Sequence, residues 1–244
     1  MTSFSQIIKA AGFCWFLLVT ASASAGGFSV APVRVFLKDV PQVVMTVGNA
    51  SESEIYIQTE LMAWTQHDEK DVYTTSREVL VSPPMFKIPA GGEQTVRVRL
   101  MGETAVSQER TFRLFLQEVP QVKADQAEVS TTLKVGVPIF IQPTKADSAN
   151  YEWQAIRSAE GITLKVKNTT NSHIQITGLK LSDSGGKLIK EENVFAYVLA
   201  DRSFHWDIKL EQPWRGDKFL LQATSDRGDI KTTVELSTPI TVAP

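Results

Sequence analysis

Few residues of this chain have the type and spacing that catalysis requires. The three histidines, His67, His173 and His205, lie far apart, and their spacing matches neither a metal site nor a catalytic triad. The single cysteine is Cys14, and the sequence lacks Gly-x-Ser-x-Gly, Walker and dinucleotide-binding glycine patterns. The run 67–69 is typical of a polar loop tip. The sequence therefore predicts no enzyme, no metal site and no cofactor.

The elements that must position any binding residues are β-strands. The clearest strand pattern lies in residues 76–120, where a turn at 89–92 separates alternating runs. Apolar residues alternate with polar ones in 95–100 and again in 111–119, where Arg113 lies on the polar face. This alternation is typical of an antiparallel sheet with one solvated face.

Short strands are predicted along the rest of the chain, and no segment has a helical period of helical length. Residues 26–143 contain seven such runs, which is typical of an immunoglobulin-like sandwich. Small and polar residues in 144–150 indicate an interdomain linker, and 151–244 is predicted to be a second β-sandwich domain. The strands expected in addition to the two above are 28–37, 40–47, 55–64, 79–81, 129–141, 153–156, 162–167, 173–181, 195–199, 204–210, 219–224 and 230–236.

The first 25 residues are predicted to be a secretory signal peptide and not part of the fold. They contain one charge, Lys9, then an apolar run over 10–19 and the cleavage pattern Ala23-Ser24-Ala25. The apolar run is too short for a permanent membrane-spanning helix. We therefore expect an exported mature chain that has no cysteine and must be stabilised by burial alone.

Charge and hydropathy exclude other classes of protein. Without Lys9 the chain has 24 basic and 27 acidic residues, a net charge near −3, and this gives no reason to expect nucleic acid as a partner. No other apolar stretch reaches 18 residues, so no stable membrane insertion is expected. About 219 mature residues are enough for two domains of usual size.

Five blocks, taken in order, resemble a known family. They are Phe28–Phe36, Ser82–Arg99, Glu109–Pro120, Leu133–Pro143 and Leu164–His173. Their order is similar to that in the periplasmic pilus-assembly chaperones, the PapD-like family. The resemblance implies an all-β protein with two immunoglobulin-like β-sandwich domains in an L-shaped arrangement.

Two departures from the family pattern are similar to its archaic, or alternative, chaperone–usher branch. The usual Pro-Gln-Asp-Arg-Glu-Ser-Leu-Phe segment is replaced by Val106–Phe112, and the usual seventh-strand lysine falls on Pro138. The resemblance implies that basic residues anchor the C-terminal carboxylate of a pilus subunit, since a guanidinium binds a carboxylate through two hydrogen bonds. Arg34 is the first candidate, and Arg113 or Lys134 would replace the missing lysine.

The resemblance also implies a location, a set of partners and a mechanism. The protein would act in the periplasm, bind pilin or fimbrial subunits by donating a strand, and deliver them to an outer-membrane usher. A self-capping homodimer through the same strand is a further possibility. Pro138 cannot donate a ladder hydrogen bond, so pairing should stop near it. The expected donor-strand residues are Val129, Thr131, Leu133, Val135 and Val137.

Other interpretations stay open on the residues alone. The alternating valines and leucines of the expected donor strand are also typical of a strand that faces its own core. Arg97 and Arg99 suit a solvated or interdomain-facing stripe. A secreted adhesin or carbohydrate-binding protein would use exposed aromatic residues, and an enzyme accessory domain would have an unrecognised site. The aromatic candidates for a sugar platform are Trp153, Trp206 and Trp214.

Overall fold

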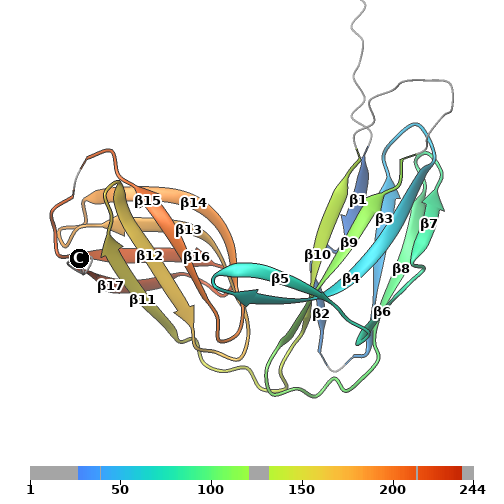
Figure 1. The fold of residues 1–244 in the computed structure, drawn as a ribbon, viewed down its shortest axis with the longest axis horizontal. Helices are drawn as coiled ribbons and strands as arrows, with labels where there is room; N and C mark the ends of the chain where they lie inside the picture. The colour runs from blue at the N-terminus through green and yellow to red at the C-terminus, as the bar shows by residue number, and fades with distance from the viewer. Residues whose placement is uncertain (1–26, 39, 121–131, 213, 238–244) are drawn as a thin grey trace, which may run out of the picture.

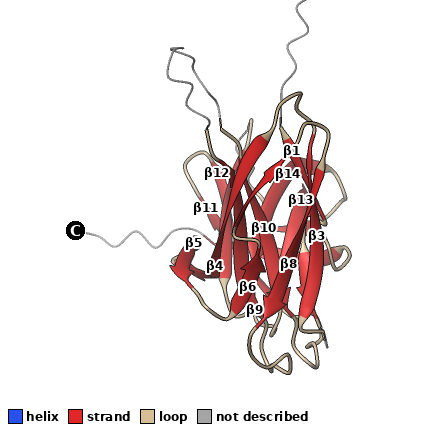
Figure 2. Ribbon diagram, turned by 90° about the vertical axis from the view of Figure 1, so that its right-hand side faces the viewer, coloured by secondary structure: helices blue, strands red, loops and turns tan. Residues whose placement is uncertain are grey.

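The structure is a computed structural model that describes residues 27–38, 40–120, 132–212 and 214–237. Within these ranges every regular element is a β-strand and none is a helix (Figures 1 and 2). No helix in the described ranges is long and apolar enough to cross a membrane. The strands form two domains that meet at an angle (Figure 1), which confirms the predicted all-β, L-shaped fold class.

The first sheet of the N-terminal domain has four strands in the order β1-β3-β8-β6. Its central strands pair antiparallel from Gln42↔Arg99 to Gly48↔Glu93. Arg97 and Arg99 lie on its exposed outer face. Of the two predicted alternatives, a solvated or an interdomain-facing stripe, the solvated one is therefore found. The strands are β1 (Phe28–Ala31), β3 (Gln42–Asn49), β6 (Val79–Ser82) and β8 (Glu93–Leu100).

The second sheet has the order β2-β10-β9-β4-β5, with β7 pairing the first half of β4. Its strands are β2 (Val35–Leu37), β4 (Ile55–His67), β5 (Lys70–Thr75), β7 (Met85–Ile88), β9 (Arg110–Glu118) and β10 (Lys134–Ile141). The inner faces of the two sheets bury one apolar core, which includes Met45, Val96, Leu114 and Ile139. The outer face of the second sheet is turned toward the C-terminal domain, because Trp64 and Phe140 on it pack against that domain.

The single strand predicted over 28–37 is wrong. The chain forms β1 in the first sheet and β2 in the second, with Pro32 and the exposed Val33 between them. Proline has no backbone N–H to donate, which favours a break in the ladder at this point. The chain therefore crosses from one sheet to the other and places Arg34 directly before β2.

The strand predicted over 55–64 is longer than expected and turns back as a hairpin. β4 continues to His67, and Asp68 and Glu69 form a turn with positive φ angles of 48° and 63° before β5. Two such residues give the backbone twist that a two-residue hairpin needs. The predicted loop tip at 67–69 is confirmed, but the hairpin that it closes extends toward the C-terminal domain (Figure 1).

The C-terminal domain follows residues 142–150, which contain no strand. Its seven strands follow one path, β14-β13-β16-β17-β11-β12-β15, in which β17 and β11 pair parallel over only two residue pairs. The predicted boundaries at 143 and 150 stay a prediction. The strands are β11 (Tyr151–Arg157), β12 (Gly161–Asn168), β13 (Ile174–Ser182), β14 (Leu188–Val198), β15 (Ser203–Lys209), β16 (Lys218–Ser225) and β17 (Ile230–Ser237).

A buried asparagine organises the loop after β3. The Nδ2 of Asn49 donates to the carbonyls of Ser53, Ile88 and Pro89 at 2.8–3.0 Å. Its Oδ1 accepts from the backbone N and the hydroxyl of Ser51 at 2.9 and 2.6 Å. One side chain thus satisfies backbone groups that are buried or partly buried.

The same arrangement recurs after β12 in the C-terminal domain. The Nδ2 of Asn168 donates to the carbonyls of Ser172, Val198 and Leu199 at 2.8–3.1 Å, and its Oδ1 accepts from the N and hydroxyl of Thr170. The two domains therefore share an Asn-x-Ser/Thr-x-Ser loop, 119 positions apart, although no repeat is predicted from the sequence.

Candidate functional site

The N-terminal part of β10 has one paired and one free edge. β9 pairs with all of β10, from Lys134↔Gln117 to Ile141↔Arg110. β2 covers the other edge only at 139–141. Among the described residues, no strand pairs with that edge over 134–138. Unpaired N–H and C=O groups on such an edge form a template for another strand.

The expected donor residues at and before the start of β10 differ in exposure. Leu133 is 40% exposed, Val135 is partly buried, and Val137 is 2% exposed within the core of its own domain. Val137 can therefore contact a partner only through its backbone. Its side chain agrees with the alternative given above, in which this strand faces the core of its own domain. The other two expected donor residues, Val129 and Thr131, lie outside the described residues.

Two of the predicted anchoring residues lie on either side of Pro138. Arg113 is the antiparallel partner of Pro138 on β9. On the other side Val35 pairs parallel with Ile139, so extending that register by one residue places Arg34 beside Pro138. Adjacent strands are about 4.8 Å apart, so the two arginine backbones are about 10 Å apart across the proline. Their long side chains extend from the same outer face, where the free edge of β10 ends.

Arg34 also contacts the C-terminal domain. Its Nη1 donates to Gln175 Oε1 at 2.9 Å and forms an ion pair with Asp226 Oδ2 at 3.1 Å. The guanidinium lies beside Tyr197: burial raises the pKa of Tyr197 above its ordinary value of 10, and the positive charge of Arg34, followed by that of Arg113, opposes this rise. Tyr197 therefore keeps its O–H donor at neutral pH, next to both arginines.

Arg113 lies over an aromatic ring without an acidic partner. Its guanidinium is 4.8 Å from the Trp64 ring centroid. Among the described residues it makes no ion pair with a carboxylate. A Cβ added to Gly136 would lie 3.1 Å from Arg113 Nε and 3.2 Å from Phe115, so the glycine leaves the room in which Arg113 lies against β10. Its positive charge is thus partly dehydrated and available to an anion.

Lys134 lies elsewhere on the same strand. Its Nζ is 3.9 Å from Glu60 Oε2 and 4.5 Å from the Phe115 ring centroid. It precedes Pro138 by four residues, about 13 Å along a strand. The structure therefore brings Arg34 and Arg113 together at the end of the free edge, and it places Lys134 apart from them.

A buried aromatic cluster joins the domains behind the arginines. His173 stacks on Phe140 with ring centroids 3.7 Å apart and an interplanar angle of 13°. Its Nδ1 lies 2.7 Å from Oε1 of Glu109, whose side chain is fully buried, and its backbone N donates to the same oxygen. Trp64 and Tyr197 complete the cluster with an edge-to-face contact at 5.4 Å. His173 therefore packs at the domain interface and is held there by Phe140 and Glu109.

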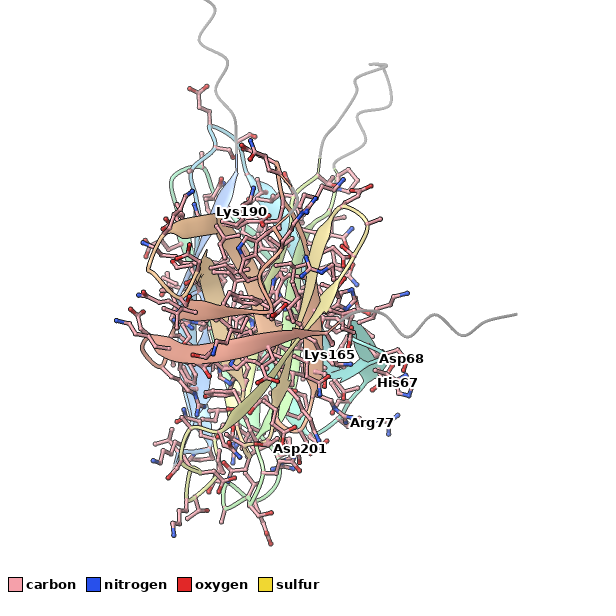
Figure 3. All side chains as sticks on the ribbon, turned by 90° about the vertical axis from the view of Figure 1, so that its left-hand side faces the viewer. His67, Asp68, Arg77, Lys165, Lys190 and Asp201 are labelled. Atoms are coloured by element: carbon pink, nitrogen blue, oxygen red, sulfur yellow. The ribbon has the colours of Figure 1, made fainter. Side chains whose placement is uncertain are left out.

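The tip of the β4–β5 hairpin forms a second polar contact with the C-terminal domain. Glu69 forms an ion pair with Lys165 at 2.6 Å and also contacts His205. The hydrogen bond from Lys165 is the main cause that holds the pKa of Glu69 below its ordinary value of 4.5. Figure 3 shows His67 and Asp68 near Lys165 at this tip. The tip borders a polar cavity of about 540 Å³.

Metal binding and sugar binding find little support in the described part of the chain. No cluster of three or more metal-ligating side chains occurs in the described part of the chain. Trp153 and Trp206 stack with centroids 6.2 Å apart and pack, partly buried, against the C-terminal core. Trp214 packs edge-to-face on Phe219 at 6.0 Å. These contacts are typical of core packing and not of an open sugar-binding platform.

Comparison with known proteins identifies the family. Residues 27–147 match the family described as "Pili and flagellar-assembly chaperone, PapD N-terminal domain". The chain belongs to the PapD-like family of pilus-assembly chaperones. Chaperone protein FaeE of Escherichia coli is 24% identical to this PapD-like chain over 196 residues, which are 78% of the chain and 72% of FaeE.

Solved structures share the two-domain fold of this PapD-like chain. One is a chain of the CsuC–CsuE chaperone–tip adhesion subunit pre-assembly complex from archaic chaperone-usher Csu pili of Acinetobacter baumannii. It matches with a TM-score of 0.63 and 18% identity over 87% of this chain and 99% of that chain. A chain of the Salmonella enterica SafA pilin–SafB chaperone complex matches with a TM-score of 0.57 and 17% identity. The match covers 84% of this chain and 95% of that chain.

Three residues at this site of the PapD-like chain are missed by sequence reasoning. Tyr197 and Gln66 come from different domains, and nothing in their local sequence indicates that they meet. Phe195 is 70% exposed on β14 and packs edge-to-face on Tyr197 at 5.8 Å. The sequence predicts Phe195 only as the first residue of the strand 195–199, and no local signal indicates its exposure.

Proposed function

We propose that this protein is a periplasmic chaperone that binds pilus subunits by strand pairing along β10 and delivers them to an outer-membrane usher. The observation that carries the proposal is the free edge over 134–138, which ends between Arg34 and Arg113. A strand that docks on this edge meets the start of β2 at Ile139 and has to end there. The two arginines lie where its chain end would be.

The arginines also set the direction of the bound strand. They lie at the C-terminal end of the free edge, beside Pro138. A strand whose C-terminal carboxylate lies between them must run parallel to β10. The carboxylate would accept charge-assisted hydrogen bonds from both guanidinium groups and one from the Tyr197 hydroxyl. We keep Arg34 and Arg113 as the anchoring pair, and Lys134 as a contact farther along the bound strand.

Energetics explain why an edge needs an anchor. Two or three backbone hydrogen bonds contribute about 2–3 kcal/mol net. Leu133 is 40% exposed and Val135 is already partly buried, so their further burial contributes less than the roughly 1.5–3 kcal/mol of a fully exposed side chain. Association costs an estimated 4–15 kcal/mol, so these terms leave little net affinity. The remainder has to come from the carboxylate contacts and from the predicted donor residues Val129 and Thr131.

Co-expression tests the proposal. The tagged chain is produced in a periplasm together with the secreted β-rich proteins encoded next to it, and a one-to-one complex is sought by pull-down. We expect recovery of a subunit that is degraded or aggregates on its own. If the chain rescues no such protein and co-purifies with none, the strand-pairing proposal fails.

Arginine variants then test the anchor. Arg113→Ala should lower subunit recovery at least tenfold, because it removes a partly dehydrated positive charge without breaking an ion pair. Arg34→Ala should do the same, and it also removes the contacts with Gln175 and Asp226. Arg97→Ala, on the exposed face of the other sheet, is the matched control. Unchanged recovery in both anchor variants contradicts the anchoring roles.

A further inference from the structure

One side chain of β4 makes buried hydrogen bonds across the domain interface. Gln66 is 4% exposed, although glutamine is rarely buried. Its Nε2 donates to the carbonyl of Tyr197 at 2.8 Å, and its Oε1 accepts from the backbone N of Leu199 at 3.0 Å. One amide thus forms two hydrogen bonds with the C-terminal domain, as a neighbouring strand would.

The second strand of the hairpin fixes this amide in place. Asp71 Oδ1 accepts a 3.0 Å hydrogen bond from Gln66 Nε2, and Asp71 Oδ2 accepts from the Tyr73 hydroxyl at 3.2 Å. Tyr73 packs edge-to-face on Phe115 of β9 at 5.4 Å. A buried polar group that is hydrogen-bonded throughout has one favourable arrangement, which makes the contact directional.

We propose that Gln66 is a positioning residue of the carboxylate site, whose amide holds the Tyr197–Leu199 segment of the C-terminal domain against Arg34 and Arg113 of the N-terminal domain. The inference rests on the function proposed above. The site is built from both domains, so its geometry depends on their relative orientation. Arg34 contacts Gln175 and Asp226 of the C-terminal domain directly. Gln66 adds two hydrogen bonds to the Tyr197–Leu199 segment, and Glu69 at the hairpin tip adds the ion pair with Lys165.

Tyr197, in the segment that Gln66 holds, lies beside Arg34 and Arg113. The direct polar contacts of Arg34 with the C-terminal domain are made by Gln175 and Asp226. Tyr197 contacts Trp64, Phe140 and His173 with ring centroids 5.4, 5.8 and 5.7 Å apart, so its backbone and ring are fixed by different partners. Without the amide, the carbonyl of Tyr197 and the N–H of Leu199 lose their partner across the interface. Water can satisfy them only if the domains move apart.

Interdomain distances measured on the free chain test the positioning role. Spin labels are attached through Glu52→Cys and Glu235→Cys, which are exposed and lie in different domains. The only native cysteine, Cys14, lies in the predicted signal peptide. Gln66→Met removes both hydrogen bonds and keeps the approximate volume. Gln58→Met is the matched control, because Gln58 lies exposed on the same face of the same strand.

We expect Gln66→Met to broaden the distance distribution, and Gln58→Met to leave it as in the parent chain. The subunit recovered by co-expression should bind Gln66→Met about tenfold more weakly, a change of about 1.4 kcal/mol. Thermal unfolding, followed by tryptophan fluorescence, shows that both domains remain folded. Glu69→Gln should have the same effects to a smaller extent.

Two results would overturn the proposal. One is an unchanged distance distribution in Gln66→Met, since the amide then does not fix the orientation of the domains. The other is a broadened distribution with unchanged subunit affinity, since orientation then does not matter for binding. If the parent chain binds no subunit, the proposed function fails, and the distance measurement alone still decides whether Gln66 orients the domains.

Discussion

Replacing Asn168 by alanine should destabilise the C-terminal domain far more than an average substitution. Its side chain is fully buried, donates to three carbonyls and accepts from the N and hydroxyl of Thr170. Alanine leaves these groups without a partner in a site closed to water. Each buried unsatisfied group costs about 1–3 kcal/mol, and partial relaxation toward water recovers some of that cost. We expect a loss of about 3–5 kcal/mol.

A loss of that size is a large part of the 5–15 kcal/mol that holds a typical domain folded. It also affects the site, because the loop that Asn168 organises continues into His173, which stacks on Phe140 of the other domain. Urea unfolding is the assay. Tryptophan fluorescence reports on it, because Trp64 lies in the N-terminal domain and Trp153, Trp206 and Trp214 lie in the C-terminal domain.

Asn193→Ala is the control, since Asn193 is an exposed asparagine of the same domain. It should change the free energy of unfolding by no more than about 0.5 kcal/mol. A loss below about 1 kcal/mol in Asn168→Ala would refute the reasoning, because it would mean that the carbonyls find other partners at little cost.

Two further predictions concern the site and its pH dependence. Gly136→Val should weaken subunit binding severalfold while the chain stays folded, because the valine side chain would occupy the space of Arg113 Nε. Gly102→Val is the control in the same binding assay, because no atom lies within 4 Å of a Cβ placed at Gly102. Glu69 has a lowered pKa, so its contribution to stability is complete above pH 4.5 and is lost as the pH falls through the lowered value. Unfolding measured from pH 6 to pH 3 should show this loss in the parent chain and less of it in Glu69→Gln; equal pH profiles for the two proteins would contradict the assignment.

Local patterns in the sequence were enough to predict the all-β fold class, several of its strands and the protein family. Alternation in 95–100 and 111–119 predicted β8 and β9, because side chains of a strand alternate between core and solvent whatever lies beside it. The order of blocks along the chain predicted the PapD-like family. The resemblance to the family also made Arg34 a candidate, because it occupies the basic position of the family's first strand. Arg113 became a candidate because it lies between two apolar residues of the sixth strand-like run.

Only the tertiary structure decided which residues meet. The break at Pro32, the register that places Arg34 beside Pro138 and the free edge over 134–138 follow from long-range strand pairing. The contact of Gln66 with Tyr197 joins residues 131 positions apart. Pairing of this kind depends on how sheets pack and on where the chain crosses between them. A local pattern of apolar and polar residues records which face of a strand is buried, but it does not record which partner buries it.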